Sequence, residues 1–249
     1  LNRCIKMIKE YSDEIIDALQ KDFGNRDPKS SFLTEIASTI GVLEHAIKNV
    51  DKWTKDEKRP SNVDRPFFIR MLMGLLGSKS YIKYQPLGTV GVISPWNFPV
   101  NLILAPLGGI FAAGNRAMIK PSELTPATSE VTKKMFEAYF DKSEAAVFTG
   151  DAEVGAAFSA LPFDHLLFTG GTQIGKKVMK AASDNLVPVT LELGGKSPVI
   201  VDENADLSEV AKKVMRGKTM NAGQICLAPD YLMLPKGKSG EFAEASNKA

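Results

Sequence analysis

The sequence has little of what several function classes require: it contains two cysteines, two histidines and almost no excess of charge. Its 31 basic and 29 acidic residues are interspersed and leave a formal net charge of +2. This balance gives no reason to expect a nucleic acid or an anionic membrane as partner. Cys4 and Cys226 lie far apart in different settings, so we expect free thiols in a reducing compartment. His45 is predicted in a helix and His165 at a strand start, and both are expected to be structural.

No apolar run is long enough to span a bilayer. The longest candidate, Pro99 to Ala113, is interrupted by Pro106 and a glycine pair. No basic segment followed by an apolar leader is present either, so we expect a cytoplasmic protein. The chain begins at Leu1 inside a predicted helix and ends in a polar tail, Lys236 to Ala249. We therefore expect a fragment of a longer protein.

The first part of the chain has a helical pattern. Residues 2 to 58 are predicted helical, with an interruption at Asp22 to Pro28 and a second helical stretch from Ser30 to about Trp53. Pro60 to Gly77 is predicted to be a turn-rich connector. It carries the apolar cluster Phe67 to Met73, which needs cover from the rest of the chain or from a second subunit.

From Ser80 onward, short apolar strands alternate with helices. This alternation predicts an α/β fold with a doubly wound, Rossmann-like parallel sheet, whose ligands bind at the carboxyl ends of the strands. The predicted strands are Thr89 to Ser94, Arg116 to Lys120, Ala145 to Phe148, Asp164 to Phe168, Val187 to Leu191 and Pro198 to Val201. The predicted helices begin at about Pro99, Thr125, Val154, Gln173 and Leu207.

Two motifs at strand ends could bind a nucleotide. Phe168 to Gly175 places a glycine-rich turn between a strand and a helix, although Thr172 stands where the G-x-G-x-x-G pattern has its second glycine. A plain strand-to-helix turn explains these glycines equally well. Lys120 and Glu123 follow another strand and could hydrogen-bond the two hydroxyls of a ribose. On this motif alone, the favoured alternative is two solvated charges beside a helix cap.

Three further residues could carry chemistry. In Pro95 to Pro99 two prolines fix the backbone, and the Asn97 amide could donate to a developing oxyanion. The alternative is a rigid apolar corner with Trp96 packed in the core. Glu192 lies between two leucines, where a carboxylate is expensive to bury unless it is paired or used as a base. Cys226 is flanked by turn residues, and a lone cysteine is more often an inert core thiol than a nucleophile.

Taken together, these motifs resemble the NAD(P)-dependent aldehyde dehydrogenase superfamily. They occur in that family's order and at compatible spacings, from the amino-terminal helices to about Leu234. Arg65 to Gly88 and Cys226 to Tyr231 look most like the coniferyl aldehyde dehydrogenase branch, near the class 3 enzymes. The matching segments are Pro95-Trp-Asn-Phe-Pro99, Lys120-Pro-Ser-Glu123, Phe168-Thr-Gly-Gly171, Glu192-Leu-Gly-Gly-Lys-Ser-Pro198 and Gly223-Gln-Ile-Cys226.

The resemblance implies a role for each matching residue. Cys226 would attack the aldehyde carbon, Asn97 would hold the oxyanion, and Glu192 would activate the water that hydrolyses the thioester. It also implies NAD as cofactor, with NADP possible, and no metal. Lys120 and Glu123 would bind the adenine ribose, where the carboxylate disfavours a 2′-phosphate. The other residues implied in cofactor binding are Ile93, Ser94, Trp96, Gly170, Gly171, Thr172, Gly175 and Leu193.

The resemblance also divides the chain into domains. Residues 1–194 would form the NAD(P)-binding domain, with a connector or oligomerisation arm near 60–86, and residues 195–249 would begin a catalytic domain that carries the nucleophile. The chain ends at about half the length of a family member, and its parent is expected to be a homo-oligomer acting on a small aldehyde. Two alternatives stay open: a coenzyme A-acylating aldehyde dehydrogenase, which Glu192 argues against, and a cofactor-binding fragment that is catalytically incomplete.

Overall fold

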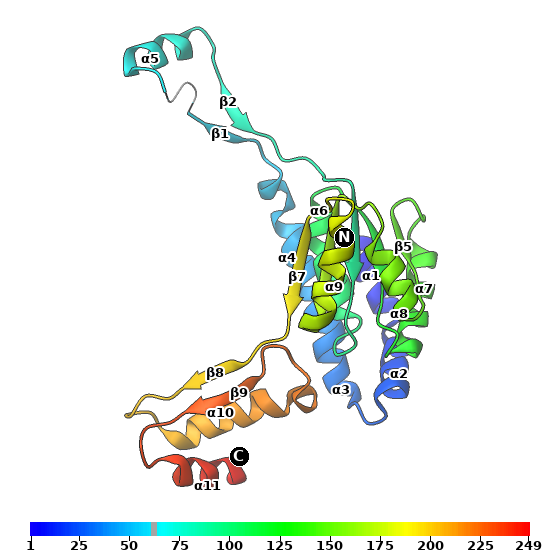
Figure 1. Cartoon of the computed structure of the whole chain (residues 1–249), viewed down its shortest axis with the longest axis vertical. Helices are drawn as coiled ribbons and strands as arrows, with labels where there is room; N and C mark the ends of the chain where they lie inside the picture. The colour runs from blue at the N-terminus through cyan, green and yellow to red at the C-terminus, as the bar shows by residue number, and fades with distance from the viewer. Residues whose placement is uncertain (61–63) are drawn as a thin grey trace.

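The computed structural model describes residues 1–60 and 64–249 and is built around a five-stranded parallel sheet (Figure 1). The strand order is β5-β4-β3-β6-β7, and every neighbouring pair is parallel. The strands are short and rich in Val, Ile and Leu, as is usual when both faces of a parallel sheet are buried. Their bounds are β3 (Thr89–Ile93), β4 (Arg116–Lys120), β5 (Ala145–Val147), β6 (His165–Gly170) and β7 (Val189–Leu193).

Helices cover both faces of this sheet, and the predicted doubly wound α/β class is confirmed. One apolar cluster joins β3, β4 and β5 to α6 (Asn101–Ala112), α7 (Pro126–Tyr139) and the amino-terminal helices. A second cluster joins β6 and β7 to α8 (Ala152–Ser159) and α9 (Thr172–Ser183). The β3–α6–β4–α7–β5 path runs toward one edge of the sheet and β6–α9–β7 toward the other, so right-handed crossovers place their helices on opposite faces.

The amino-terminal segment is helical, as predicted, but it ends earlier than expected. The last helix stops at Trp53, and Glu57–Arg59 form strand β1, which pairs antiparallel with β2 (Ser80–Ile82). The helical prediction to residue 58 is therefore wrong at its end, because strand pairing takes over where the apolar periodicity fades. The helices are α1 (Asn2–Glu10), α2 (Ser12–Phe23), α3 (Pro28–Ser31), the π-helix η1 (Phe32–Ala37) and α4 (Ser38–Trp53).

The predicted turn-rich connector Pro60 to Gly77 contains a helix. Residues Phe67–Leu75 form α5, which follows Pro66 as its N-cap and is composed mostly of good helix formers. Pro66 and Gly77 flank this helix, whereas Gly74 lies within it. Residues 61–63 of this predicted connector lie outside the described residues. The side chains of α5 are exposed, which agrees with the expectation that this apolar segment needs cover.

Two extensions leave the central body at opposite ends (Figure 1). The β1–β2 pair carries α5 away from the sheet at one end. At the other end, β8 (Ser197–Ile200) and β9 (Pro229–Met233) form a parallel pair beside α10 (Leu207–Thr219) and α11 (Ser239–Lys248). Within the described ranges, no helix combines the length and the apolar character needed to cross a bilayer.

Candidate active site

A cleft of about 470 Å³ opens at the carboxyl ends of β3, β4 and β6. The chain's path through the sheet changes direction between β3 and β6, and doubly wound sheets bind their ligands at such a switch point. Most of the residues that the sequence associates with a cofactor line this cleft, whereas Thr172, Gly175 and Leu193 do not. The predicted residues in the lining are Ile93, Ser94, Trp96, Lys120, Glu123, Gly170 and Gly171.

Gly171 and Gly175 of the glycine-rich turn have different structural roles. A Cβ added at Gly171 would meet no atom within 4 Å, so this residue, the N-cap of α9, borders open space. A Cβ at Gly175 would lie only 2.9 Å from Leu193 Cδ2, so that glycine allows α9 to pack closely on β7. Thr172 is the first residue of α9. The turn therefore leaves room at the amino end of a helix, where an anion is favoured.

Lys120 and Glu123 form an ion pair at the rim of the cleft. Lys120 Nζ donates to Glu123 Oε2 and to the Pro121 carbonyl, each at 3.0 Å. The Lys120 side chain is only 2% exposed and that of Glu123 is 43% exposed, so the alternative of two solvated charges is wrong for the lysine. A hydrogen bond from its own backbone N–H, with Lys120 beside it, holds the pKa of Glu123 below its ordinary value. Glu123 is thus a carboxylate at neutral pH.

Ser94 and Trp96 complete the wall that follows β3. Trp96 is 37% exposed and borders the cleft, so the alternative that buries it in the core is wrong. Ser94 Oγ is buried and has no hydrogen-bond partner among the described residues. A buried hydroxyl without a partner in the lining of a cleft is suited to a polar ligand group.

Asn97 links the end of β3 to the loop that carries Cys226. Its Nδ2 donates to the Gln224 carbonyl at 2.9 Å. Its own carbonyl accepts from Asn221 Nδ2 at 3.1 Å and from Arg26 Nη1 at 3.2 Å. A side-chain amide has two N–H donors, so one bond to Gln224 leaves a second donor for another acceptor.

The loop before Cys226 is strained. Asn221, Ala222 and Gly223 have φ of 49°, 54° and 77°, three successive residues in the left-handed region. For a residue with a Cβ this conformation costs about 1–2 kcal/mol, and such strain is often found at functional sites. Cys226 follows this loop and is exposed, whereas Cys4 is completely buried and burial raises the pKa of its thiol. Of the two free thiols, Cys226 is the accessible one.

Glu192 is exposed, so the expectation of a carboxylate in an apolar environment is wrong for this structure. It lies on β7 opposite Thr169, which borders the cleft. An ideal Cβ built on Gly195 would lie 3.5 Å from the Cys226 carbonyl oxygen, so the segment after Glu192 reaches the loop that carries Cys226. Lys196, which follows Glu192 in the same motif, pairs with Asp230, at 3.2 Å.

Two residues behind Asn97 were missed by the sequence analysis. Arg26 Nη2 and Glu35 Oε1 lie 2.9 Å apart, with side chains 5% and 0% exposed. Glu35 Oε2 accepts from the backbone N–H groups of Val100 and Asn101, at 3.1 and 2.8 Å. Because this carboxylate caps α6, the helix begins at Asn101 rather than at Pro99. The sequence held one signal for Glu35: it is a polar residue at helical spacing among the apolar residues of the amino-terminal segment.

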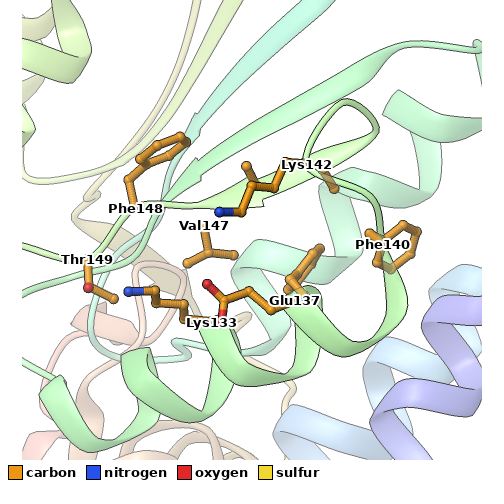
Figure 2. A pocket seen from close by; sticks show the side chains of 10 residues that line it. Lys133, Glu137, Phe140, Lys142, Val147, Phe148 and Thr149 are labelled. Carbon is orange, nitrogen blue, oxygen red and sulfur yellow. The ribbon is translucent and has the colours of Figure 1, made fainter.

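A second cavity, of about 330 Å³, lies at the sheet edge formed by β5 and α7. Figure 2 shows the charged ends of Lys133, Glu137 and Lys142 turned toward this hollow. Phe140 and Phe148 also line it, but none of the residues singled out from the sequence does. In the part of the chain that the structure describes, no cluster of three His, Cys, Asp or Glu residues could hold a metal ion.

Comparison with known proteins identifies the family. The aldehyde dehydrogenase family model matches residues 1–249. The chain is 52% identical, over 99% of its length, to coniferyl aldehyde dehydrogenase of Pseudomonas sp. strain HR199, of which it covers 49%. Among solved structures, the substrate-bound state of Staphylococcus aureus AldH matches 99% of the chain and 52% of its own at a TM-score of 0.89 and 41% identity.

A more distant solved structure is the Mycobacterium tuberculosis aldehyde dehydrogenase complexed with NAD⁺. It matches 99% of this chain and 48% of its own, with a TM-score of 0.84 and 26% identity. The chain spans about half the length of the curated relatives that it matches. With a family model covering every residue, this chain belongs to the aldehyde dehydrogenase family.

Proposed function

We propose that this chain provides the cofactor cleft and the nucleophile of an NAD-dependent aldehyde dehydrogenase that oxidises an aromatic, coniferyl-type aldehyde to its acid. The observation that carries the proposal is the hydrogen bond from Asn97 to the Gln224 carbonyl. It joins the strand end that borders the cleft to the loop of the exposed Cys226 thiol. The aromatic substrate class is supported by the named function of the Pseudomonas relative.

The proposed chemistry uses three residues. The Cys226 thiolate attacks the aldehyde carbon and forms a thiohemiacetal, whose oxyanion accepts hydrogen bonds from the Asn97 amide and the Cys226 backbone N–H. Loss of hydride from that carbon leaves a thioester on the sulfur. Glu192 then removes a proton from a water molecule, which attacks the thioester and releases the carboxylic acid. The exposure of Glu192 leaves it accessible to water.

The residues that line the cleft fit a nicotinamide dinucleotide, which would supply the hydride acceptor when bound. Lys120 and Glu123 present an ammonium and a carboxylate to a ribose diol. Gly171 leaves open space at the amino end of α9, where a pyrophosphate is favoured. The ionised Glu123 would repel a 2′-phosphate, so NAD is proposed over NADP. The M. tuberculosis relative, which was solved with NAD⁺, supports the same cofactor.

We also propose the division into a cofactor-binding domain, residues 1–194, and the start of a catalytic domain, residues 195–249. The position of β8 and β9 in a separate two-stranded sheet supports it. The exposed apolar helix α5 supports an oligomeric parent, and the two free thiols support a reducing compartment such as the cytosol. One observation favours a second candidate, a cofactor-binding but catalytically incomplete piece: the chain covers about half of its relatives.

A steady-state assay of NADH formation with coniferaldehyde tests the proposal. The assay is run on this chain and on the longest protein that its gene encodes. The Cys226→Ala and Cys4→Ala variants of that longer protein are assayed beside them. Cys226→Ala is expected to abolish turnover and Cys4→Ala to retain it, because Cys4 is buried in the core. Unchanged turnover in Cys226→Ala would refute the nucleophile assignment. Turnover in the longer protein only, with NAD binding in both, would support the second candidate for this chain.

A further inference from the structure

We propose that the buried Arg26–Glu35 pair positions the Asn97 amide, an inference that rests on the proposed function of Asn97. The pair lies behind the Asn97 loop and contacts it at two places. Arg26 Nη1 donates to the Asn97 carbonyl at 3.2 Å. Glu35 Oε2 accepts from the N–H groups of Val100 and Asn101. The backbone is thus anchored on both sides of Phe98 and Pro99, directly beside the residue whose amide must be aimed.

The Arg26 guanidinium is held in one orientation. Its carbon lies 4.8 Å from the ring centroid of Phe23 and 5.3 Å from that of Phe98. Its Nη2 donates to Thr34 Oγ1 at 3.2 Å and lies 2.9 Å from Glu35 Oε1. A planar cation packed against two rings and directed to two oxygens has little rotational freedom. Its hydrogen bond therefore holds the Asn97 carbonyl in a fixed position.

Glu35 anchors the other end of the loop. It belongs to the π-helical turn Phe32–Ala37, an irregular helix form that is frequent at functional sites. Its Oε2 accepts from two N–H groups at the start of α6 that have no partner within the helix. In α4, which directly follows this turn, Thr39 Oγ1 accepts from Asn101 Nδ2 at 2.8 Å. The first turn of α6, and with it the end of the loop, is held by this carboxylate and its neighbours.

Stability alone explains this pair poorly. Replacing a buried ion pair by apolar residues of similar volume is often neutral or stabilising, because desolvation offsets the attraction between the charges. A displacement of about 1 Å in a catalytic group, in contrast, can lower a rate about a hundredfold. The positioning role accounts for a buried charge pair that is directed at the Asn97 loop from two sides.

A double-mutant cycle in the longest protein that the gene encodes tests the proposal. Its variants are Arg26→Met, Asn97→Ala and the double variant, assayed for kcat and for KM of aldehyde and NAD. We expect Arg26→Met to lower kcat about 10- to 100-fold, no more than the loss of about 100- to 1,000-fold that is typical for removing an oxyanion donor. KM for NAD should change less than about twofold. In the Asn97→Ala background, Arg26→Met should lower kcat by less than about twofold, because its effect passes through the missing amide.

Arg26→Lys keeps the proposal testable if the Arg26→Met variant does not fold. It keeps a cation and should give a smaller loss of kcat that again disappears in the Asn97→Ala background. Lys134→Met is the matched control: its ion pair with Glu14 is exposed on α2 and α7, and kcat should not change. Equal losses in both backgrounds, or no loss for either Arg26 variant, would overturn the positioning role. Failure of Cys226→Ala to abolish turnover would instead overturn the proposed function, so the two failures are distinguishable.

Discussion

Replacing Glu35 by glutamine removes a carboxylate that is completely buried beneath the Asn97 loop. Burial raises the pKa of this carboxyl from 4.5 to about 7, against the opposing effects of Arg26 and of the N–H groups of Asn101 and Val100. Between these two pH values the folded protein holds a proton that the unfolded chain has released. The stability contributed by the protonated carboxyl is therefore present below about pH 4.5 and is lost as the pH rises through about 7.

The size of this loss follows from the same pKa difference. A change in pKa from 4.5 to about 7 corresponds to about 3 kcal/mol. We expect the free energy of unfolding of the wild type, minus that of Glu35→Gln, to fall by up to this amount between about pH 4.5 and 7. Urea denaturation of both proteins at half-unit pH steps measures the difference and cancels the other titrating groups.

Glu14→Gln is the control, because Glu14 is half exposed in its pair with Lys134 and such pairs contribute little in water. Its difference from wild type should vary little over the same range. A wild-type minus Glu35→Gln difference that rises with pH would contradict a raised pKa of Glu35. It would mean that Arg26 and the two N–H donors outweigh desolvation and hold the carboxyl ionised.

Four other substitutions test the cleft and the loop that carries Cys226. Gly175→Ala places a Cβ 2.9 Å from Leu193 Cδ2 and should lower the free energy of unfolding by about 1–3 kcal/mol, whereas Gly171→Ala meets open space and should mainly weaken NAD binding in a fluorescence titration. A loss of stability in Gly171→Ala and weaker NAD binding in Gly175→Ala would contradict the roles given to these two glycines. Glu123→Gln removes the charge at the proposed ribose site and should raise the ratio of NADP to NAD turnover, and an unchanged ratio would argue against that site. Gly223→Ala adds a Cβ at φ +77°, 3.1 Å from the Lys218 carbonyl oxygen, and should reduce stability by about 1–2 kcal/mol in urea unfolding. Unchanged stability would show that the loop can relax.

Local patterns were sufficient to predict most of the fold. Short strands such as Arg116–Lys120 alternate with amphipathic helices, and this alternation allows few arrangements other than a parallel, doubly wound sheet. The same patterns placed Ile93, Ser94 and Lys120 at strand ends, and strand ends of a parallel sheet meet at one edge. Errors arose where a long-range contact decides the boundary. The start of α6 depends on a carboxylate 66 positions away in sequence, and periodicity carries no trace of that hydrogen bond.

The same reason explains what was missed in the candidate site. Arg26 and Asn97 are 71 positions apart, and Asn97 and Gln224 are 127 apart, so only the folded chain brings them together. Motifs identified Asn97 and Cys226 as residues of interest, but not the contacts that connect their loops. Glu192 is the converse case: its apolar neighbours suggested burial, yet it lies exposed on β7. Its side chain occupies the face of an edge strand that this chain leaves open.

Trapping the acyl group on the protein tests whether Cys226 is the nucleophile. The longest protein that the gene encodes, carrying Glu192→Gln, is mixed with NAD⁺ and coniferaldehyde, quenched in acid and mapped by peptide mass spectrometry. We expect an acyl adduct on the peptide that contains Cys226, because thioester formation proceeds while its hydrolysis is slowed. NADH formation with no adduct on Cys226, or with an adduct on another residue, would contradict it.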